Sequence, residues 1–194
     1  MKRVVAVLVR RTMAQAAPPG VDPATFLAAI AEDTYEMAAG LDLVTPVLVT
    51  SVPGLDDIVW PGTEIVTIDD AEPLKAVLAR LHADQAAVIG ADAPDLPPLL
   101  VGKLFRELGR AEITVCPAEN GGAVALACAL PAPDWAEPDL DADDVVGALR
   151  AQAPGPRRVA TTPGWHRLRS AGDVARLDPG LEGWDNTRAL IRAR

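Results

Sequence analysis

The chain is poor in the residues on which many familiar functional sites depend. Among its 194 residues are only two cysteines and two histidines, and aromatic residues make up 4%. The cysteines and histidines do not show the spacing of zinc ligands, which disfavours a zinc protein. No P-loop or Ser-His-Asp pattern is visible, so P-loop nucleotide hydrolases and triad hydrolases are disfavoured as well.

Both cysteines, Cys116 and Cys128, lie in apolar runs, where a free cysteine behaves as a small hydrophobic residue. So few cysteines fit a reducing compartment, and we therefore expect buried thiols in a cytoplasmic protein. A disulfide across adjacent strands is the alternative.

Positive charge is also scarce, because 18 lysines and arginines stand against 27 acidic residues for a net charge of −9. Nucleic-acid binding depends on clustered Lys and Arg that neutralise phosphates, so the composition argues against a nucleic-acid partner.

Long apolar runs are absent as well, since no stretch approaches the ~20 residues of a membrane helix. The apolar run Val4 to Val9 near the start is followed at once by Arg10-Arg11, which indicates a buried strand rather than a signal peptide. We expect no membrane partner.

Hydrophobic residues make up 49% of the chain and charged residues 23%, which is enough for a substantial core. The length fits one domain, which we predict to span residues 1–194. The oligomeric state is not predictable from these features.

Strand-like and helix-like segments alternate along the chain, which predicts an α/β fold with helices covering a sheet. Strands are expected at 3–9, 43–50, 63–68, 86–90, 112–116, 123–130 and 157–160. Helices are expected at 23–39, 72–82, 97–108, 141–152, 170–177 and 184–192, the first with Asp22 as its N-cap and Gly40 at its end.

One position could carry chemistry on physical grounds. The apolar strand Ala86 to Gly90 is of the kind buried in a parallel sheet, and Asp92 and Asp95 follow directly after it. Ligands of open α/β sheets bind beyond the carboxyl ends of strands, and Mg²⁺ prefers such carboxylates together with substrate phosphates. Asp95 has an alternative role as the N-cap of the next helix.

A glycine pair, Gly121-Gly122, follows Glu119-Asn120 between two predicted strands. Glycine allows positive φ or a close approach of backbone to ligand, but Asn-Gly is also a strong signal for a simple hairpin turn.

Together, the stretches Val88–Leu96 and Pro117–Gly122 resemble a family of glycosyltransferase-A-like proteins named after arsenosugar biosynthesis or selenium-associated genes. The family pattern is roughly G-x-D-x-P-x-L followed by P-x-x-D-G-G-Y. More distantly, the chain is similar to phospholactate guanylyltransferases.

The resemblance implies a three-layer α/β/α fold with a mostly parallel, mixed sheet, the nucleotide-diphospho-sugar transferase fold. It also implies a nucleotide-sugar or nucleoside-triphosphate substrate held with Mg²⁺ or Mn²⁺. Asp92 would then be the metal- or phosphate-side carboxylate and the catalytic residue, and Gly121 and Gly122 would line the acceptor pocket beside Glu119.

The chain departs from the family pattern at charged positions. Where the family has a cationic K-T-R-L-like segment, the nearest cations here are Arg10 and Arg11, which would serve the substrate's phosphates. Asn120 replaces an aspartate, and Arg167 and Arg169 stand where the family tends to have acidic residues. Asn keeps an acceptor oxygen but not the charge that attracts a metal.

Two hypotheses follow. In the first, the protein transfers a glycosyl or nucleotidyl group, with Arg10, Arg11, Asp95, Glu119, Asn120, Gly121 and Gly122 in the substrate site and Asp92 on the metal. In the second, a catalytically degenerate relative binds a small ligand or a protein partner.

Overall fold

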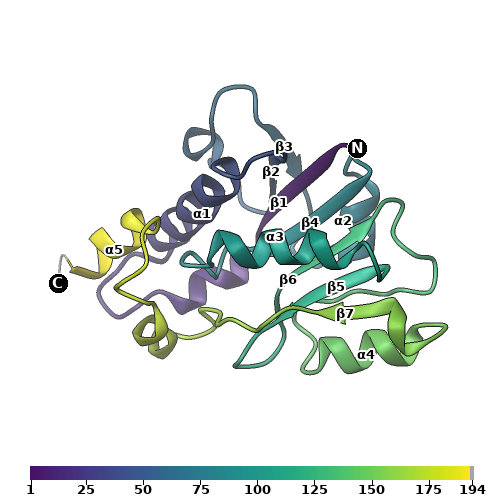
Figure 1. Cartoon of the computed structure of the whole chain (residues 1–194). Helices are drawn as coiled ribbons and strands as arrows, with labels where there is room; N and C mark the ends of the chain where they lie inside the picture. Colours follow the sequence, from purple (N-terminus) through teal and green to yellow (C-terminus); the bar gives the residue numbers. More distant parts are fainter. Residues whose placement is uncertain (193–194) are drawn as a thin grey trace.

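The computed structural model describes residues 1–192; Ala193 and Arg194, at the end of the predicted domain, lie outside the described residues. Its centre is a seven-stranded sheet with the order β3-β2-β1-β4-β6-β5-β7 (Figure 1). The strands are β1 (Arg3–Val9), β2 (Thr45–Thr50), β3 (Glu64–Thr67), β4 (Gln85–Gly90), β5 (Ile113–Pro117), β6 (Ala123–Ala129) and β7 (Val159–Thr161). Neighbouring strands are parallel except where β6 pairs with β4 and β5, so the sheet is mostly parallel and mixed.

Helices cover both faces of this sheet, because the strands are apolar on both sides. Alternate residues of β1 show this, since Val5 and Val7 join one buried cluster and Val4 and Ala6 join the other. The helices α1 (Pro23–Ala39), α3 (Pro98–Glu107) and α5 (Asp185–Arg192) lie on the first side, whereas α2 (Leu74–Ala79) and α4 (Val145–Gln152) lie on the second. The predicted three-layer α/β/α architecture is confirmed.

Local signals place some helix ends well. The Asp22 carboxylate accepts a hydrogen bond of 2.9 Å from the backbone N–H of Thr25, and Pro23 and Gly40 lie at the predicted start and end of α1. Helix α2 is shorter than the predicted 72–82, and α4 begins four residues later than predicted, with Asp144 as its N-cap. The predicted helix at 170–177 is the 3₁₀ helix η4 (Ala171–Arg176).

The prediction that Asp95 caps helix α3 is wrong. Pro97 occupies the N-cap position and no side chain caps the helix. The Asp95 carboxylate bonds instead to groups far along the chain, which a local sequence pattern cannot reveal.

Both cysteines are free and buried, as predicted. Burial raises the pKa of the Cys128 thiol to about 12, so this thiol stays protonated at neutral pH. No helix in residues 1–192 combines the length and the apolar character needed to cross a membrane.

One buried carboxylate connects helix α5 to helix α1. Asp33 of α1 accepts hydrogen bonds from the backbone N–H groups of Asn186 (3.0 Å) and Thr187 (2.8 Å) in the first turn of α5. We expect Asp33→Ala to lower the free energy of unfolding by about 2–3 kcal/mol, because these donors lose a charged acceptor. Urea denaturation measures the loss, and hydrogen exchange should be faster in α5. Glu32→Ala, at the half-buried neighbouring position, is the control; equal losses in the two variants would contradict this role.

Candidate functional site

The candidate site lies where the strand order changes direction. The chain runs from β1 outward to β2 and β3, and β4 then returns to the other side of β1. The carboxyl ends of β1 and β4 therefore lie side by side at a switch point, which is where open α/β sheets bind ligands. The 3₁₀ helix η1 (Arg11–Ala16) follows β1 there, and Asp92 follows β4.

Two hollows meet at this edge of the sheet and share Asp141. One, of about 340 Å³, is lined by Thr12, Met13, Gln15, Asp92, Asp141, Arg167, Leu168 and Arg169. The other, of about 380 Å³, is lined by Leu8, Arg10, Ala71, Glu72, Pro73, Leu74, Glu137, Pro138, Asp139, Leu140 and Asp141. We call them the arginine hollow and the acidic hollow. Each volume is in the range of small-molecule sites.

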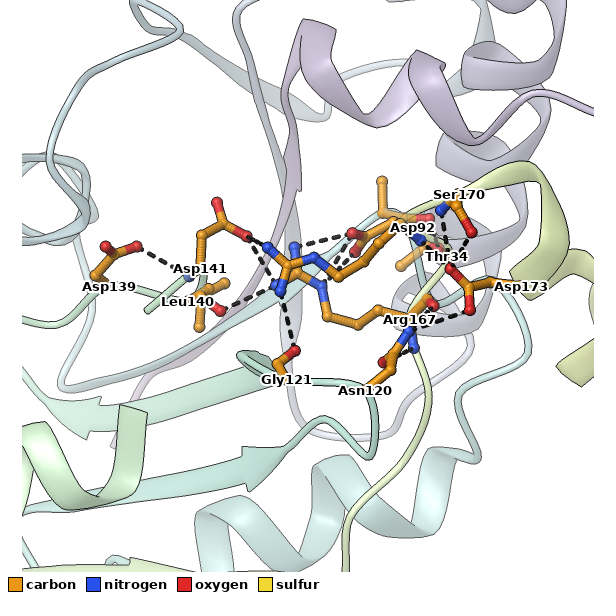
Figure 2. A network of polar contacts seen from close by, with 12 residues as sticks. Thr34, Asp92, Asn120, Gly121, Asp139, Leu140, Asp141, Arg167, Ser170 and Asp173 are labelled. Carbon is orange, nitrogen blue, oxygen red and sulfur yellow. Dashed lines mark hydrogen bonds and ion pairs between the residues drawn. The ribbon is translucent and has the colours of Figure 1, made fainter. Parts of the chain in front are cut away.

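A buried ion pair forms the floor of the arginine hollow. The Arg167 Nε atom lies 3.1 and 2.9 Å from the two Asp92 carboxylate oxygens, and its Nη2 atom lies 2.8 Å from Oδ2 (Figure 2). Both side chains are at most 4% exposed. This two-pronged geometry is the strong form of an arginine–carboxylate contact.

Arg167 also contacts the loop that leads to α4. Its Nη1 atom donates to the Leu140 carbonyl oxygen at 2.9 Å and lies 2.9 Å from Asp141 Oδ1. Burial disfavours the charged form of Arg167, but the carboxylates of Asp92 and Asp141 more than offset it, so the pKa of the guanidinium is raised above its usual value. Arg167 is therefore a permanent cation between two carboxylates.

Glycines make room for this pair. At Gly90, the last residue of β4, an added Cβ would lie 2.5 Å from Asp92 Oδ1, so glycine lets the carboxylate fold back against the strand. At Gly122 (φ +82°), an added Cβ would lie 2.6 Å from the Leu140 oxygen and 3.1 Å from Arg167 Nη1. The glycine pair thus packs against the charged network rather than forming a turn alone.

Asn120 and Glu119 lie at the border of the site. Asn120 Nδ2 donates to the backbone oxygen of Arg167 at 3.0 Å, which holds the Arg167 segment against the β5–β6 turn. Glu119 is exposed and lies 3.9 Å from Arg176. Neither lines the two hollows. The backbone oxygen of Gly121 accepts a bond of 3.1 Å from Arg169, whose side chain is 35% exposed.

Of the two predicted cations after β1, Arg10 lines the acidic hollow. Its guanidinium donates to the backbone oxygens of Asp70 and Glu72, so it supports the wall of that hollow. The backbone N–H of Arg11 donates to Asp70 Oδ1 at 2.9 Å, and the residue is exposed.

Asp95 lies outside both hollows. Its carboxylate is 2.9 Å from His166 Nε2 and accepts bonds from Trp165 Nε1 (3.1 Å) and the backbone N–H of Asp178 (3.0 Å). The carboxylate is 0% exposed. Asp95 therefore holds the segment that follows β7 in place through these contacts.

The donor groups around Asp92 do not fit the predicted divalent cation. Both carboxylate oxygens already contact the Arg167 guanidinium, and a metal there would face a positive charge at close range. Within residues 1–192, no cluster of three or more His, Cys, Asp or Glu side chains is arranged to hold a metal.

Sequence reasoning missed Asp141, Thr12 and Gln15, which line the arginine hollow. It named Arg167 and Arg169 as departures from a family pattern, and those changes of charge were the available signal for the network.

Comparison with known proteins defines the fold. A model of the family described as "Uncharacterized protein conserved in bacteria (DUF2064)" matches residues 68–137, which include Asp92 and the Gly121-Gly122 pair but not Arg167. No curated protein matches the chain in sequence.

Solved structures match over almost the whole chain. A proposed nucleotide-diphospho-sugar transferase from Desulfovibrio desulfuricans G20 has a TM-score of 0.69 at 18% identity, with 100% of this chain and 98% of that one covered. CMP:2-keto-3-deoxy-manno-octonic acid synthetase complexed with CTP has a TM-score of 0.62 at 12% identity (100% and 99% covered). Rv0371c from Mycobacterium tuberculosis H37Rv complexed with manganese has a TM-score of 0.54 at 20% identity, with 99% of this chain and 98% of that one covered.

These similarities confirm the predicted nucleotide-diphospho-sugar transferase fold. At such identities they show the fold alone. The narrower resemblance to the arsenosugar and selenium-associated group, and to phospholactate guanylyltransferases, stays a prediction.

Proposed function

We propose that this protein binds a nucleoside triphosphate or a nucleotide sugar across the two hollows and transfers its nucleotidyl or glycosyl group. The observation that carries the proposal is the cleft at the β1–β4 switch point, which has the partly exposed Arg169 in one half and Glu137 and Asp139 in the other. The CTP bound by a protein of the same fold supports this class of ligand.

The charges favour one orientation of the ligand. Arg169 is partly exposed in the arginine hollow, where it can form charge-assisted hydrogen bonds with phosphate. Glu137 and Asp139 line the acidic hollow, and carboxylates accept hydrogen bonds from sugar hydroxyls and base amino groups. The phosphates would therefore lie near η1 and the nucleoside near α2.

In a transfer reaction, the oxygen of an acceptor hydroxyl attacks the α-phosphorus of a triphosphate, or C1 of a nucleotide-linked sugar, and the hydroxyl proton passes to water. Pyrophosphate or the nucleotide then leaves with the electron pair of the broken bond. Arg169 would stabilise the charge that develops on the leaving phosphate.

A direct test is a thermal-shift titration of nucleoside triphosphates and nucleotide sugars. A ligand at 100 times its dissociation constant should stabilise the fold by about 2.7 kcal/mol. Arg169→Ala should weaken binding about tenfold or more, because it removes a charged hydrogen-bond donor of about 1.5–3 kcal/mol. Arg106→Ala, which removes a cation that is 72% exposed on α3, is the matched control. No stabilisation by any compound would refute the proposal.

The same titration should be repeated with Mg²⁺ and Mn²⁺, the predicted cofactors. Rv0371c, which has this fold, is complexed with manganese. Tighter nucleotide binding with either cation would indicate that the metal ion binds together with the substrate's phosphates.

One observation favours the second function, ligand binding without catalysis. The Asp92 carboxylate, the predicted catalytic group, is fully engaged by Arg167 and is not available as a base or metal ligand. Release of pyrophosphate or nucleoside diphosphate in the presence of candidate acceptors would decide for transfer.

A further inference from the structure

The cleft contains a cation that belongs to the protein itself. Arg167 lies between Asp92, which follows β4, and Asp141, which precedes α4, and contacts both carboxylates at 2.8–2.9 Å (Figure 2). Holding two carboxylates from separate segments at one point is the task that a divalent cation performs in many phosphate-binding sites.

The charge balance is also that of a metal site. Arg169 lies 3.7 Å from Asp141, so two arginines balance the two carboxylates. Together they supply the charge of one divalent ion, and Arg169 keeps part of its side chain exposed to the hollow.

The surrounding chain holds the guanidinium in a fixed place. The Leu140 carbonyl oxygen accepts a hydrogen bond from the guanidinium, and the Asn120 side chain donates one to the backbone oxygen of Arg167. Gly122 has no Cβ, which would otherwise crowd Arg167 Nη1. A chance contact of a surface arginine would not have support from three separate residues.

We propose that Arg167 is a built-in cation that replaces a bound divalent metal between Asp92 and Asp141, so that phosphate groups are received at this position without a metal. The replacement of the metal is independent of the ligand. The part that concerns phosphate rests on the proposed function.

Manganese alone tests the proposal, because free Mn²⁺ loses its six-line electron paramagnetic resonance signal when it binds. We expect the wild-type protein to bind Mn²⁺ no more tightly than Asp92→Asn does. Arg167→Ala leaves Asp92 without its partner and leaves Asp141 with Arg169 at 3.7 Å. We therefore expect this variant to bind Mn²⁺ at least tenfold more tightly than wild type and to melt at a higher temperature when Mn²⁺ is added. The double variant Asp92→Asn/Arg167→Ala should lose this gain, which separates the site from the exposed acidic residues nearby.

Two results would overturn the proposal: Mn²⁺ binding to wild type that Asp92→Asn removes, or no gain of Mn²⁺ affinity in Arg167→Ala. If Arg167→Ala does not fold, Arg167→Gln keeps a polar side chain of intermediate length without the charge, and the comparison of wild type with Asp92→Asn still decides. These experiments use no nucleotide. Failure of every nucleotide to bind would refute the proposed function but not the built-in cation. Tight Mn²⁺ binding at Asp92 would refute the built-in cation but not the proposed function.

Discussion

Replacing Arg167 with alanine should lower the free energy of unfolding by about 3–5 kcal/mol, because Asp92 would be left as a buried charge without its partner. Chemical denaturation with two independent probes measures this loss. The matched control is Arg176→Ala, since Arg176 is 46% exposed and pairs with Asp173 on the same terminal segment. A surface pair of that kind is worth about 1 kcal/mol or less.

A second comparison separates charge from packing. Replacing both partners with apolar residues, as in Asp92→Leu/Arg167→Met, should cost less than Arg167→Ala alone, because no unpaired charge remains in the interior. Equal losses for Arg167→Ala and Arg176→Ala would show that the buried pair does not have the stabilising role assigned to it.

The second large effect is expected at the glycine pair. Gly122→Ala should lower the free energy of unfolding by about 3 kcal/mol, since it combines an unfavourable positive φ with a clash against the Leu140 oxygen. The clash should also displace Arg167, whose Nη1 atom would lie 3.1 Å from the new Cβ.

Gly121→Ala is the control for that prediction. Gly121 has a similar φ of +91°, but the atom nearest to its added Cβ, Arg169 Nη1, is 3.9 Å away. The strain alone should cost about 1 kcal/mol. Thermal melting of the two variants gives the difference, and a Gly121→Ala loss as large as that of Gly122→Ala would mean that backbone strain, not the packed arginine, explains the pair.

Most of the fold can be predicted from the sequence because its signals are local. The apolar run Val4 to Val9 forms β1, and the Asp22-Pro23 pair starts α1 where the capping pattern places it. Short elements were less predictable. Helix α2 ends at Ala79 although the apolar spacing continues to Leu81, which is still buried. An apolar pattern indicates which residues are buried, and buried residues can continue beyond the end of a helix.

The candidate site could be predicted only in part. A carboxylate after a buried central strand indicates the position of Asp92, because strand ends meet at one edge of a sheet. Its partner Arg167 lies 75 residues further along the chain, and no spacing rule connects the two. The role of Asp95 was mispredicted for the same reason, because its partner His166 lies 71 residues further along the chain. Local reasoning sees a helix cap there, whereas the tertiary fold uses the carboxylate elsewhere.

The buried carboxylates Asp33, Asp92 and Asp95 have a common property: the groups that neutralise or hydrogen-bond them all come from residues 165–187. During synthesis on the ribosome, the sheet strands up to β6 emerge well before those partners do. Until then the three acids lack these partners, and burying them would cost free energy. We therefore expect a polypeptide that stops short of this segment to leave the cleft open and to be cleaved by proteases faster than the whole chain.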